Sequence, residues 1–495
     1  MVIVLFVVGI AGYAWYLNSE INRVDVKGLV GGGVGAEAAS ENILLIGSTS
    51  RCALKVQNPA YGLCSQNAAV NSDVVMIVHL GTGANKVTLL SIPRDTFVPN
   101  ARAEGANKID AGLAEGPSQL VASIEENFGI PIQHFVELNF DTFANIVNAL
   151  GGVRMYFPMP VYDHYSGLDV TTPGCHTLNG VQALQVVRAQ HLQYQGPGVT
   201  STDPATWPQE MESDLARIRR DHEFLRVIVS AMAHKGLGNP ATDLQLVSSV
   251  APQLEVDSGF SMTDIADLLV TLHGVNPNKA PQVTIPISTS TFGSYIYQGG
   301  DYGDVVFPTE PEDQNAIDSF LGVTPATDTM TGRALPQPAA VSVEVLNGTG
   351  VPNQAADTAT SLGGLGFHVT GTGDSPSVST QAAETVAYYA GPAEHAAAET
   401  VARSLSGFVI TSEDAAMASP GSQVTLVTGS DFTVNAGAVA PTTSTPPTST
   451  TSTPVSSSTA SANSTPAGFQ APSASVQGLA PWDPRACTAS GGEGT

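Results

Sequence analysis

Three apolar segments near the beginning of the chain constrain the fold more than any other feature. They read NILLIG at residues 42–47, DVVMIVHL at 73–80 and KVTLLSIP at 86–93. Each has the length of a strand, and its apolar character is nearly continuous, which is typical of strands that are covered on both faces. We therefore predict a sheet that is covered by other elements on each side.

Helical patterns alternate with strand patterns after these segments. Residues 117–129 open with Pro117, carry an apolar stripe and end at Gly129, which is the signature of a helix. The further segments, in chain order, are a strand at 135–140, a helix at 141–152 with Asp141 as its N-cap, a strand at 153–157, and helices at 179–192 and 212–232. This alternation over about 200 residues predicts an α/β layered domain.

Changes in composition divide the chain into regions. In order, we predict a membrane anchor at 1–17, a stalk at 18–40, the α/β domain at 41–322, a Thr/Pro/Ala linker at 323–338, a smaller α+β domain at 339–434 and a disordered tail at 435–495. The tail is rich in Thr, Ser and Pro, a composition that cannot bury a core. The smaller domain carries no catalytic constellation of its own.

The anchor rests on an uncharged run at residues 2–17, which ends with Trp15 and Tyr16. The run is shorter than the roughly 20 residues of a typical transmembrane helix, but aromatic residues favour the membrane interface. No small-residue cleavage site follows, so we predict an uncleaved, single-pass anchor; a buried core helix is the alternative. The anchor would place the bulk of the chain outside the cytoplasm, where disulfides are permitted.

Charge and cysteine usage argue against two classes of function. Lys and Arg number 19 and Asp and Glu 44, a net charge of −25, which argues against sequence-independent binding of nucleic acid. Four cysteines without a CxxC spacing argue against a structural zinc site. Cys52 and Cys64 are close enough in sequence to pair, whereas Cys175 and Cys487 have no obvious partner.

The few arginines gather near predicted strand ends and on two predicted helices. Arg51 follows the first apolar segment and Arg94 follows the third, while Arg188, Arg217 and Arg220 lie on helices. Loops at the carboxyl ends of strands bind ligands in open α/β sheets. Because the planar guanidinium meets phosphate with two hydrogen bonds, the pattern predicts a phosphate site. Ordinary solvated ion pairs are the alternative.

Two aspartates accompany these arginines. Asp73 begins the second apolar segment, and Asp95 follows Arg94 directly. Carboxylates beside phosphate-binding arginines favour Mg²⁺, a hard ion that takes oxygen ligands and substrate phosphates. A strand-end cap or a salt bridge is the alternative for each. His191 and His222, on the arginine-bearing helices, are interpreted as structural residues.

Six stretches resemble the LytR-CpsA-Psr family of extracytoplasmic phosphotransferases. They are NILLIGSTSR, NSDVVMIVHL, KVTLLSIPRDT, ANKIDAGLAEG, LNGVQALQVVRAQH and SDLARIRRDHEFL, in the family's order across residues 42–230. SIPRDT followed by NKI is the most specific of these signals. Residues 341–434 are similar to the C-terminal domain that accompanies the family in actinobacteria.

The resemblance implies a core with a three-layer mixed sheet between helices, and a membrane-anchored enzyme. Such enzymes move a glycopolymer from a polyprenyl-pyrophosphate lipid to peptidoglycan through a phosphodiester, with the lipid tail in an apolar channel. Carried over, the residues matching the pyrophosphate-binding arginines are Arg51, Arg94, Arg188 and Arg217, with Arg220 as the second arginine of the last motif. Asp73 matches a Mg²⁺-linked aspartate. Asp95 is our candidate to orient or deprotonate the acceptor hydroxyl, or else to fix Arg94.

Four positions depart from the family pattern. Thr49 stands where a metal-binding aspartate is usual, Asn71 and Gln190 replace arginines, and Asp221 replaces a glutamine. These departures keep open an alternative function, a non-catalytic wall protein that binds polyprenyl phosphate or glycan. A direct role in transcription is disfavoured, because an acidic, exported chain has no route to DNA.

Overall fold

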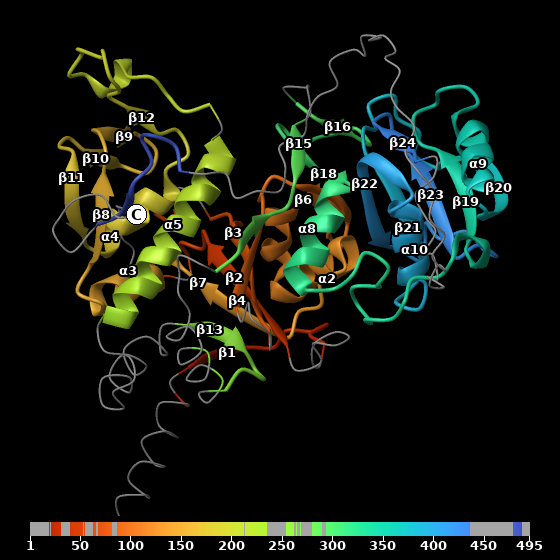
Figure 1. Cartoon of the computed structure of the whole chain (residues 1–495), viewed down its shortest axis with the longest axis horizontal. Coiled ribbons are helices and arrows are strands. Elements are labelled where there is room, and N and C mark those ends of the chain that lie inside the picture. Colours follow the sequence, from red (N-terminus) through yellow and green to blue (C-terminus); the bar gives the residue numbers. More distant parts are fainter. Residues whose placement is uncertain are drawn as a thin grey trace, which may run out of the picture.

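The computed structural model describes most of the chain (Figure 1). The described residues are 21–30, 40–52, 68–81, 87–211, 213–234, 254–261, 280–289, 294–435 and 479–487, with Ser19, Leu54, 63–65, Asp264 and Leu268. The predicted anchor at 1–17 lies outside them. None of the helices in these ranges combines the length and the apolar character needed to cross a membrane.

A seven-stranded mixed sheet forms the centre of the molecule. Its order is β1 (Asn22–Val24), β13 (Glu255–Asp257), β7 (His134–Leu138), β2 (Glu41–Ser48), β3 (Ser72–Leu80), β4 (Val87–Ile92) and β14 (Gln282–Thr284). The three apolar segments are thus the adjacent strands β2, β3 and β4, and every residue of β4 is buried, as predicted. The stalk prediction is wrong for residues 22–24, because they pair with β13 as an edge strand.

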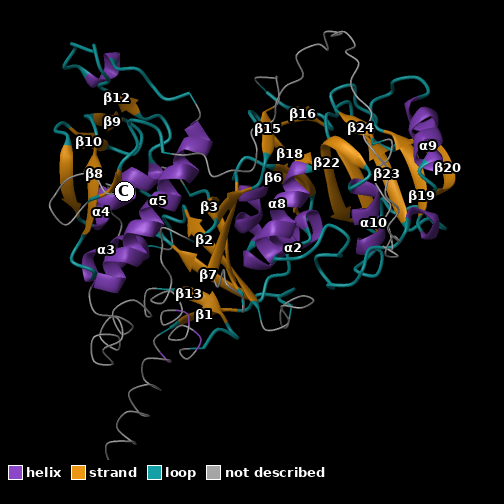
Figure 2. Ribbon diagram, in the orientation of Figure 1, coloured by secondary structure: helices purple, strands orange, loops and turns teal. Residues whose placement is uncertain are grey.

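Helices cover both faces of this sheet, which confirms the three-layer prediction (Figure 2). One face packs on α2 (Pro117–Phe128) and α8 (Glu312–Leu321) through Leu44, Ile77 and Leu90. The other face packs on α3 (Phe140–Ala149), α4 (Gly180–Arg188) and α5 (Ser213–His234).

The ends of these helices follow local chemistry. Gly129 ends α2 in the left-handed conformation, with φ 60°, where a glycine carries no steric penalty. The N-cap of α3 is Asn139, whose side chain accepts from the Thr142 backbone N–H at 3.0 Å. The prediction of Asp141 as the cap is therefore wrong, because the helix begins one residue earlier, at Phe140.

Two small sheets extend the lobe that holds α3, α4 and α5. One contains β11 (Gly174–Leu178), β8 (Val153–Phe157) and β25 (Arg485–Ala486), and the other contains β10 (Leu168–Val170), β9 (Val161–Asp163) and β12 (Gln193–Tyr194). A 3-10 turn, η4 (Pro204–Thr206), follows β12.

Strand β25 comes from the segment predicted to be a disordered tail. Residues 479–487 return to this lobe, far from the end of the smaller domain (Figure 1). The Trp482 ring stacks on Tyr194 with centroids 4.1 Å apart, and Cys487 forms a disulfide with Cys175. The prediction of disorder over 435–495 therefore does not hold for residues 479–487. Because Cys487 was assigned to that tail, it was not recognised as the partner of Cys175.

The smaller domain is built on an eight-stranded sheet. Its order is β15 (Ile287–Thr289), β18 (Val306–Glu310), β22 (Leu405–Glu413), β21 (Thr385–Tyr389), β23 (Val424–Thr428), β19 (Ser342–Asn347) and β20 (His368–Asp374), with β24 (Phe432–Val434) beside β22. Helices α9 (Gln354–Gly364) and α10 (His395–Ala402) pack on it. Because β15 and β18 lie within the region predicted as the first domain, the two domains share a sheet across the predicted boundary.

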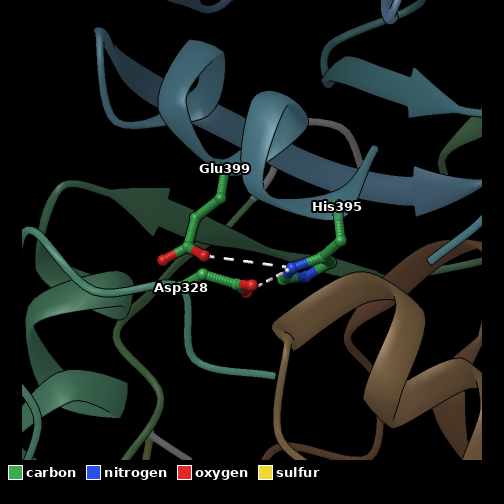
Figure 3. A group of neighbouring side chains, drawn as sticks. All are labelled: Asp328, His395 and Glu399. Atoms are coloured by element: carbon green, nitrogen blue, oxygen red, sulfur yellow. Dashed lines mark hydrogen bonds and ion pairs between the residues drawn. The ribbon is translucent and has the colours of Figure 1, made fainter. Parts of the chain in front are cut away.

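The predicted linker at 323–338 is packed between the two domains. Figure 3 shows Asp328 of this segment beside two residues of α10. The Asp328 carboxylate lies 2.8 Å from Nδ1 of His395, and all three side chains, with Glu399, are buried. Glu399 in turn binds Arg403, which pairs with Asp318 of α8 at 2.7 Å. This network fastens α10 to the first domain.

The remaining elements connect the two domains. They are the hairpin of β5 (Phe97–Arg102) and β6 (Gly105–Lys108), the 3-10 helix η3 (Ile109–Glu115), the hairpin of β16 (Ile296–Tyr297) and β17 (Gly300–Asp301), and the 3-10 turn η6 (Pro338–Ala340). Phe97 of β5 packs edge-on against Tyr295 and Tyr302, so the two hairpins contact each other.

Candidate active site

The topology brings four loops to one edge of the central sheet. Strands β2, β4 and β7 run parallel to one another, because β3 lies antiparallel between β2 and β4. Their carboxyl ends and the beginning of β3 therefore meet at the same edge. Arg51 follows β2, Arg94 follows β4, Phe140 follows β7, and Asp73 lies at the beginning of β3.

An apolar cavity of about 220 Å³ lies beneath this edge, between the sheet and three helices. Most of its lining is aliphatic or aromatic and comes from β2, β3, α3, α4 and α5: Leu45, Met76, Leu138, Phe140, Phe143, Ile146, Leu184, Val187, Phe224, Leu225 and Ile228. The charged residues that line it are Asp73, Arg188, Arg217 and Asp221. Ile146 of α3 belongs both to the main hydrophobic cluster and to the wall of this cavity.

Asp73 is the centre of the charged end of this cavity. Its Oδ1 lies 2.7 Å from Nη1 of Arg94 and 3.9 Å from Nη1 of Arg217. With its amide oxygen facing the two guanidinium groups, Gln190 accepts from Arg94 at 3.1 Å and from Arg217 at 2.8 Å. Gln190, which stands where the family often has an arginine, therefore joins the two arginines with a neutral group.

The other two predicted arginines flank an aromatic ring. The guanidinium carbons of Arg188 and Arg51 lie 4.7 and 5.4 Å from the centre of the Phe140 ring, within the range of cation–π attraction. Burial, and then the charge of Arg51, lower the pKa of Arg188, while Asp73 opposes the shift. The structure thus brings Arg51, Arg94, Arg188 and Arg217 together, as predicted.

A second group of charges lies on the other side of Arg94. Asp95 accepts from Nζ of Lys108 at 2.8 Å and lies 3.4 Å from Nε of Arg94. Asp110 accepts from the Asn71 amide at 3.1 Å. Burial, with the charges of Asp95 and Asp73, raises the pKa of Asp110 to about 6, against Arg94 and Lys108. Sequence reasoning gave Asp110 no role, although it lies in the quoted stretch ANKIDAG.

Asp73, Asp95 and Asp110 are oxygen donors of the kind that Mg²⁺ prefers. Burial raises the pKa of Asp110 first of all, and the charges of Asp95 and Asp73 add to that rise, which a cation bound nearby would oppose. Within the described ranges, the only three ligand-type side chains whose atoms approach within 4.8 Å are Asp328, His395 and Glu399. The three aspartates of the site therefore do not converge on one point, and an ion on Asp73 would need phosphate and water to complete its shell.

Thr49 and Asn71 have structural contacts in place of the charges usual in the family. The Thr49 hydroxyl accepts from the Asn71 backbone N–H at 3.0 Å, and the Thr49 N–H donates to the Asn71 carbonyl at 2.9 Å. These bonds join the loop after β2 to the loop before β3. Cys52 and Cys64, whose spacing allowed them to pair, form a disulfide next to Arg51.

Arg220 is not brought to the charged end of the cavity. Its guanidinium is fully buried and binds both oxygens of Glu210 at 2.7 Å, with Oδ1 of Asp483 at 3.3 Å. It also donates to the carbonyl of Ala189, which precedes Gln190. Through the Ala189 carbonyl, Arg220 therefore holds the loop after α4 in position. The structural interpretation of His222 is supported, since it is buried against the Ser91 hydroxyl at 2.7 Å.

Asp163 fixes the same loop from the opposite side. Its Oδ2 accepts from the backbone N–H groups of Gln190 and His191 at 3.0 and 2.8 Å, and its side chain is fully buried. No motif of the sequence singled out Asp163. It is the last residue of β9, and a single aspartate at the end of a short strand carries no recognisable signal.

Two family models match this chain. The LytR_cpsA_psr family model matches residues 18–306, and a model described as LytR cell envelope-related transcriptional attenuator matches residues 340–432. The first match spans more than half of the chain and includes every residue of the site described above.

Two bacterial proteins are similar to parts of the chain. The probable cell wall biosynthesis protein LcpB of Corynebacterium glutamicum is 30% identical over 262 residues, 52% of this chain and 58% of LcpB. The polyisoprenyl-teichoic acid–peptidoglycan teichoic acid transferase TagT of Bacillus subtilis is 28% identical over 220 residues, 43% of this chain and 61% of TagT. The matches thus span 58% and 61% of these two relatives.

Among solved structures, the LytR-Csp2A-Psr enzyme from Actinomyces oris matches 54% of this chain and 88% of its own, with 24% identity and a TM-score of 0.44. The family assignment rests on the model match, which extends over the central sheet, from β1 to β14, and over the arginine-bearing helices. The chain belongs to the LytR-CpsA-Psr family.

Proposed function

We propose that this protein is a phosphotransferase that moves a glycopolymer from a polyprenyl-pyrophosphate carrier to peptidoglycan through a phosphodiester bond. One observation carries the proposal: an apolar cavity ends at a cluster of four arginines. A polyprenyl pyrophosphate has an apolar chain and an anionic head, so a single molecule satisfies both parts of the site. The name of the relative TagT, with polyisoprenyl-linked glycopolymer and peptidoglycan, supports the same substrate classes.

Arg51, Arg94, Arg188 and Arg217 would bind the pyrophosphate. These four guanidinium groups outnumber the two carboxylates that pair with them, Asp73 and Asp95, so a multiply charged anion would balance the site. Preorganised cations stabilise the charge that develops on the leaving phosphate, which is the main catalytic need of a phosphoryl transfer.

Asp95 would orient or deprotonate the acceptor hydroxyl. Its carboxylate lies between Lys108 and Arg94, next to the arginine that would hold the phosphate.

Mg²⁺ is the proposed cofactor. Asp73 would be its main protein ligand, with phosphate oxygens and water in the other positions, and the ion would supply charge neutralisation at the pyrophosphate. Because Asp73 also binds Arg94 and Arg217, it would orient both arginines in the same complex.

We also propose that the protein acts at the outer face of the cell membrane. The support is the uncharged run at residues 2–17 together with the two disulfides, Cys52–Cys64 and Cys175–Cys487. Disulfides persist in oxidising compartments and are rare in the cytoplasm. The donor lipid and the peptidoglycan acceptor both belong to that location.

The test is transfer by the purified full chain in detergent, with a polyprenyl-pyrophosphate-linked sugar, a peptidoglycan oligomer and Mg²⁺, with or without EDTA. We expect a phosphodiester-linked product in the mass spectrum, lost with EDTA and lowered at least about 100-fold by Arg94→Ala. The matched control is Arg154→Ala, at an exposed arginine of β8. Lipid retained without product under any condition would favour the non-catalytic binding protein, and unchanged turnover in Arg94→Ala would contradict the site.

A further inference from the structure

A second cavity, of about 450 Å³, lies on the opposite side of the Asp73–Arg94 ion pair from the apolar one. Its wall is formed by the loop after β4, the β5–β6 hairpin, the beginning of η3 and the β16–β17 hairpin. Its volume lies in the range of small-ligand sites, roughly 300–1,000 Å³. The two cavities are therefore separate in space but adjacent at Arg94.

The chemistry of this second cavity is unlike that of the first. Charged and carboxamide side chains make up most of its lining, and the charges are balanced. The cations are Arg94, Arg102 and Lys108, and the carboxylates are Asp95, Asp110 and Asp301. Balanced charge disfavours an anion as such, and the scarcity of apolar lining disfavours a lipid. Alternating donors and acceptors suit a ligand rich in hydroxyl and amide groups.

Two side chains of the wall, Arg102 and Tyr302, suit such a ligand. Nε of Arg102 is buried and has no hydrogen-bond partner among the residues that the structure describes. Because Arg102 lines the cavity, its guanidinium, a group of N–H donors, is placed to meet acceptor groups of a ligand there. Tyr302 adds a ring that is held edge-on against Phe97, with centroids 5.2 Å apart. A ring of this kind can pack against the C–H face of a sugar.

We infer that this cavity binds the acceptor, a sugar unit of the peptidoglycan glycan strand, with Arg102 and Tyr302 as its recognition residues. The inference rests on the proposed phosphotransferase function and adds to it the place of the second substrate. Arg94 and Asp95 line the cavity and also border the arginine cluster. A hydroxyl group in the cavity therefore lies next to a phosphate held by Arg94.

The transfer step balances in this arrangement. The acceptor hydroxyl oxygen attacks the phosphorus that carries the glycan, and its proton passes to Asp95. The bond from that phosphorus to the bridging oxygen breaks, and polyprenyl phosphate leaves with the electron pair. The products are a glycan–phosphate–peptidoglycan diester and polyprenyl phosphate.

Two variants test the cavity separately from the donor site. In the full chain, Arg102→Met and Tyr302→Leu are expected to raise the KM for a soluble peptidoglycan glycan fragment about tenfold. The KM for the polyprenyl-pyrophosphate donor should stay within about twofold of the unchanged protein. Arg154→Ala, on the exposed side of β8, is the matched control, and a thermal melt of each variant establishes folding. Because Arg102 has no ion pair to lose among the described residues, its replacement tests binding with little effect on the fold.

Direct binding separates this inference from the proposed function. Saturation-transfer NMR with the same fragment needs no turnover, so it reports on the cavity alone. Fragment binding that Arg102→Met weakens, in a protein without transferase activity, would support the cavity and contradict the proposed function. Active transfer with an acceptor KM that neither variant changes would overturn the cavity assignment and leave the function intact. Absence of saturable fragment binding would also overturn it.

Discussion

Helix α5 contributes arginines to two networks of arginines and carboxylates, which differ in their exposure to solvent and in their charge balance. At the cavity, Arg217 faces Asp73, and the Arg94 and Asp73 side chains remain 25% and 24% exposed. Three residues further along, Arg220 binds Glu210 and Asp483, and all three side chains are at most 1% exposed. The open network has an excess of cations, whereas the sealed one balances Arg219 and Arg220 against Glu210 and Asp483.

This difference distinguishes arginines that bind a ligand from arginines that stabilise the fold. A buried, charge-balanced network is already satisfied, and removing one member leaves an uncompensated charge. An open network with excess positive charge is satisfied only when an anion arrives. Exposure and charge balance together therefore assign a role that the residue type alone does not.

The largest effect should come from breaking the sealed network. Arg220→Ala leaves Glu210 and Asp483 buried without their shared guanidinium, and we expect a loss of about 3–5 kcal/mol in the free energy of unfolding. Urea denaturation of the full chain measures it, with the exposed Arg154→Ala as control. A loss below about 1 kcal/mol would show that the two networks do not differ in this way.

The open network should respond in activity more than in stability. Arg217→Ala is expected to lower transferase turnover about 10²–10³-fold, because it removes a preorganised cation at the phosphate. Its unfolding free energy should fall by at most about 1–2 kcal/mol, less than in Arg220→Ala: the side chain is buried, but its ion pair with Asp73 is long, at 3.9 Å, and the neighbouring arginines repel it. Product formation and a urea melt of the same preparation compare the two quantities. A stability loss equal to that of Arg220→Ala would contradict the distinction.

How much of the fold and of the site could be predicted from the sequence depends on how far apart along the chain the contacting residues lie. The central sheet, its covering helices and the arginines Arg51, Arg94, Arg188 and Arg217 follow from local periodicity and from motifs at strand ends. The role of Arg220 does not, because Asp483 lies 263 residues away, in a segment whose neighbours have a disordered composition.

Other contacts could not be predicted for related reasons. Gln190 was recognised only as a departure from the family pattern, since a bridge between two guanidinium groups depends on the spacing of β4 and α5. The Cys175–Cys487 disulfide and the strand pairing of β25 depend on the same return of the chain. We likewise could not predict that β15 and β18 join the sheet of the smaller domain, because a strand's own residues do not show which strand it pairs with.

The buried His222 of α5, which contacts Ser91, should make the stability of the protein depend on pH. Burial lowers the pKa of His222 to about 4 from its ordinary 6.5, so the folded state binds this proton less readily than the unfolded state. Its contribution is therefore fully present above pH 6.5 and is lost as the pH falls towards 4, by about 3 kcal/mol at most. The measurement is the unfolding free energy at intervals from pH 7.5 to 4. In His222→Gln, which can keep the bond to Ser91, this part of the acid sensitivity should disappear; an identical pH profile would contradict it.

The smallest effect should come from Arg219, which shares Asp483 with Arg220. Arg219→Ala removes the 2.7 Å contact from Nε to Oδ2 of Asp483, but that carboxylate keeps Arg220 and the Ala480 backbone N–H. We expect a loss of about 1–2 kcal/mol in urea denaturation and unchanged turnover, since Arg219 lines neither of the two cavities. Asp483→Asn is the matched comparison, because it weakens both arginine contacts at once. If Arg219→Ala destabilised as much as Arg220→Ala, the returning segment 479–487, and not Glu210, would be the centre of the sealed network, and the docking of that segment would then determine the position of α5.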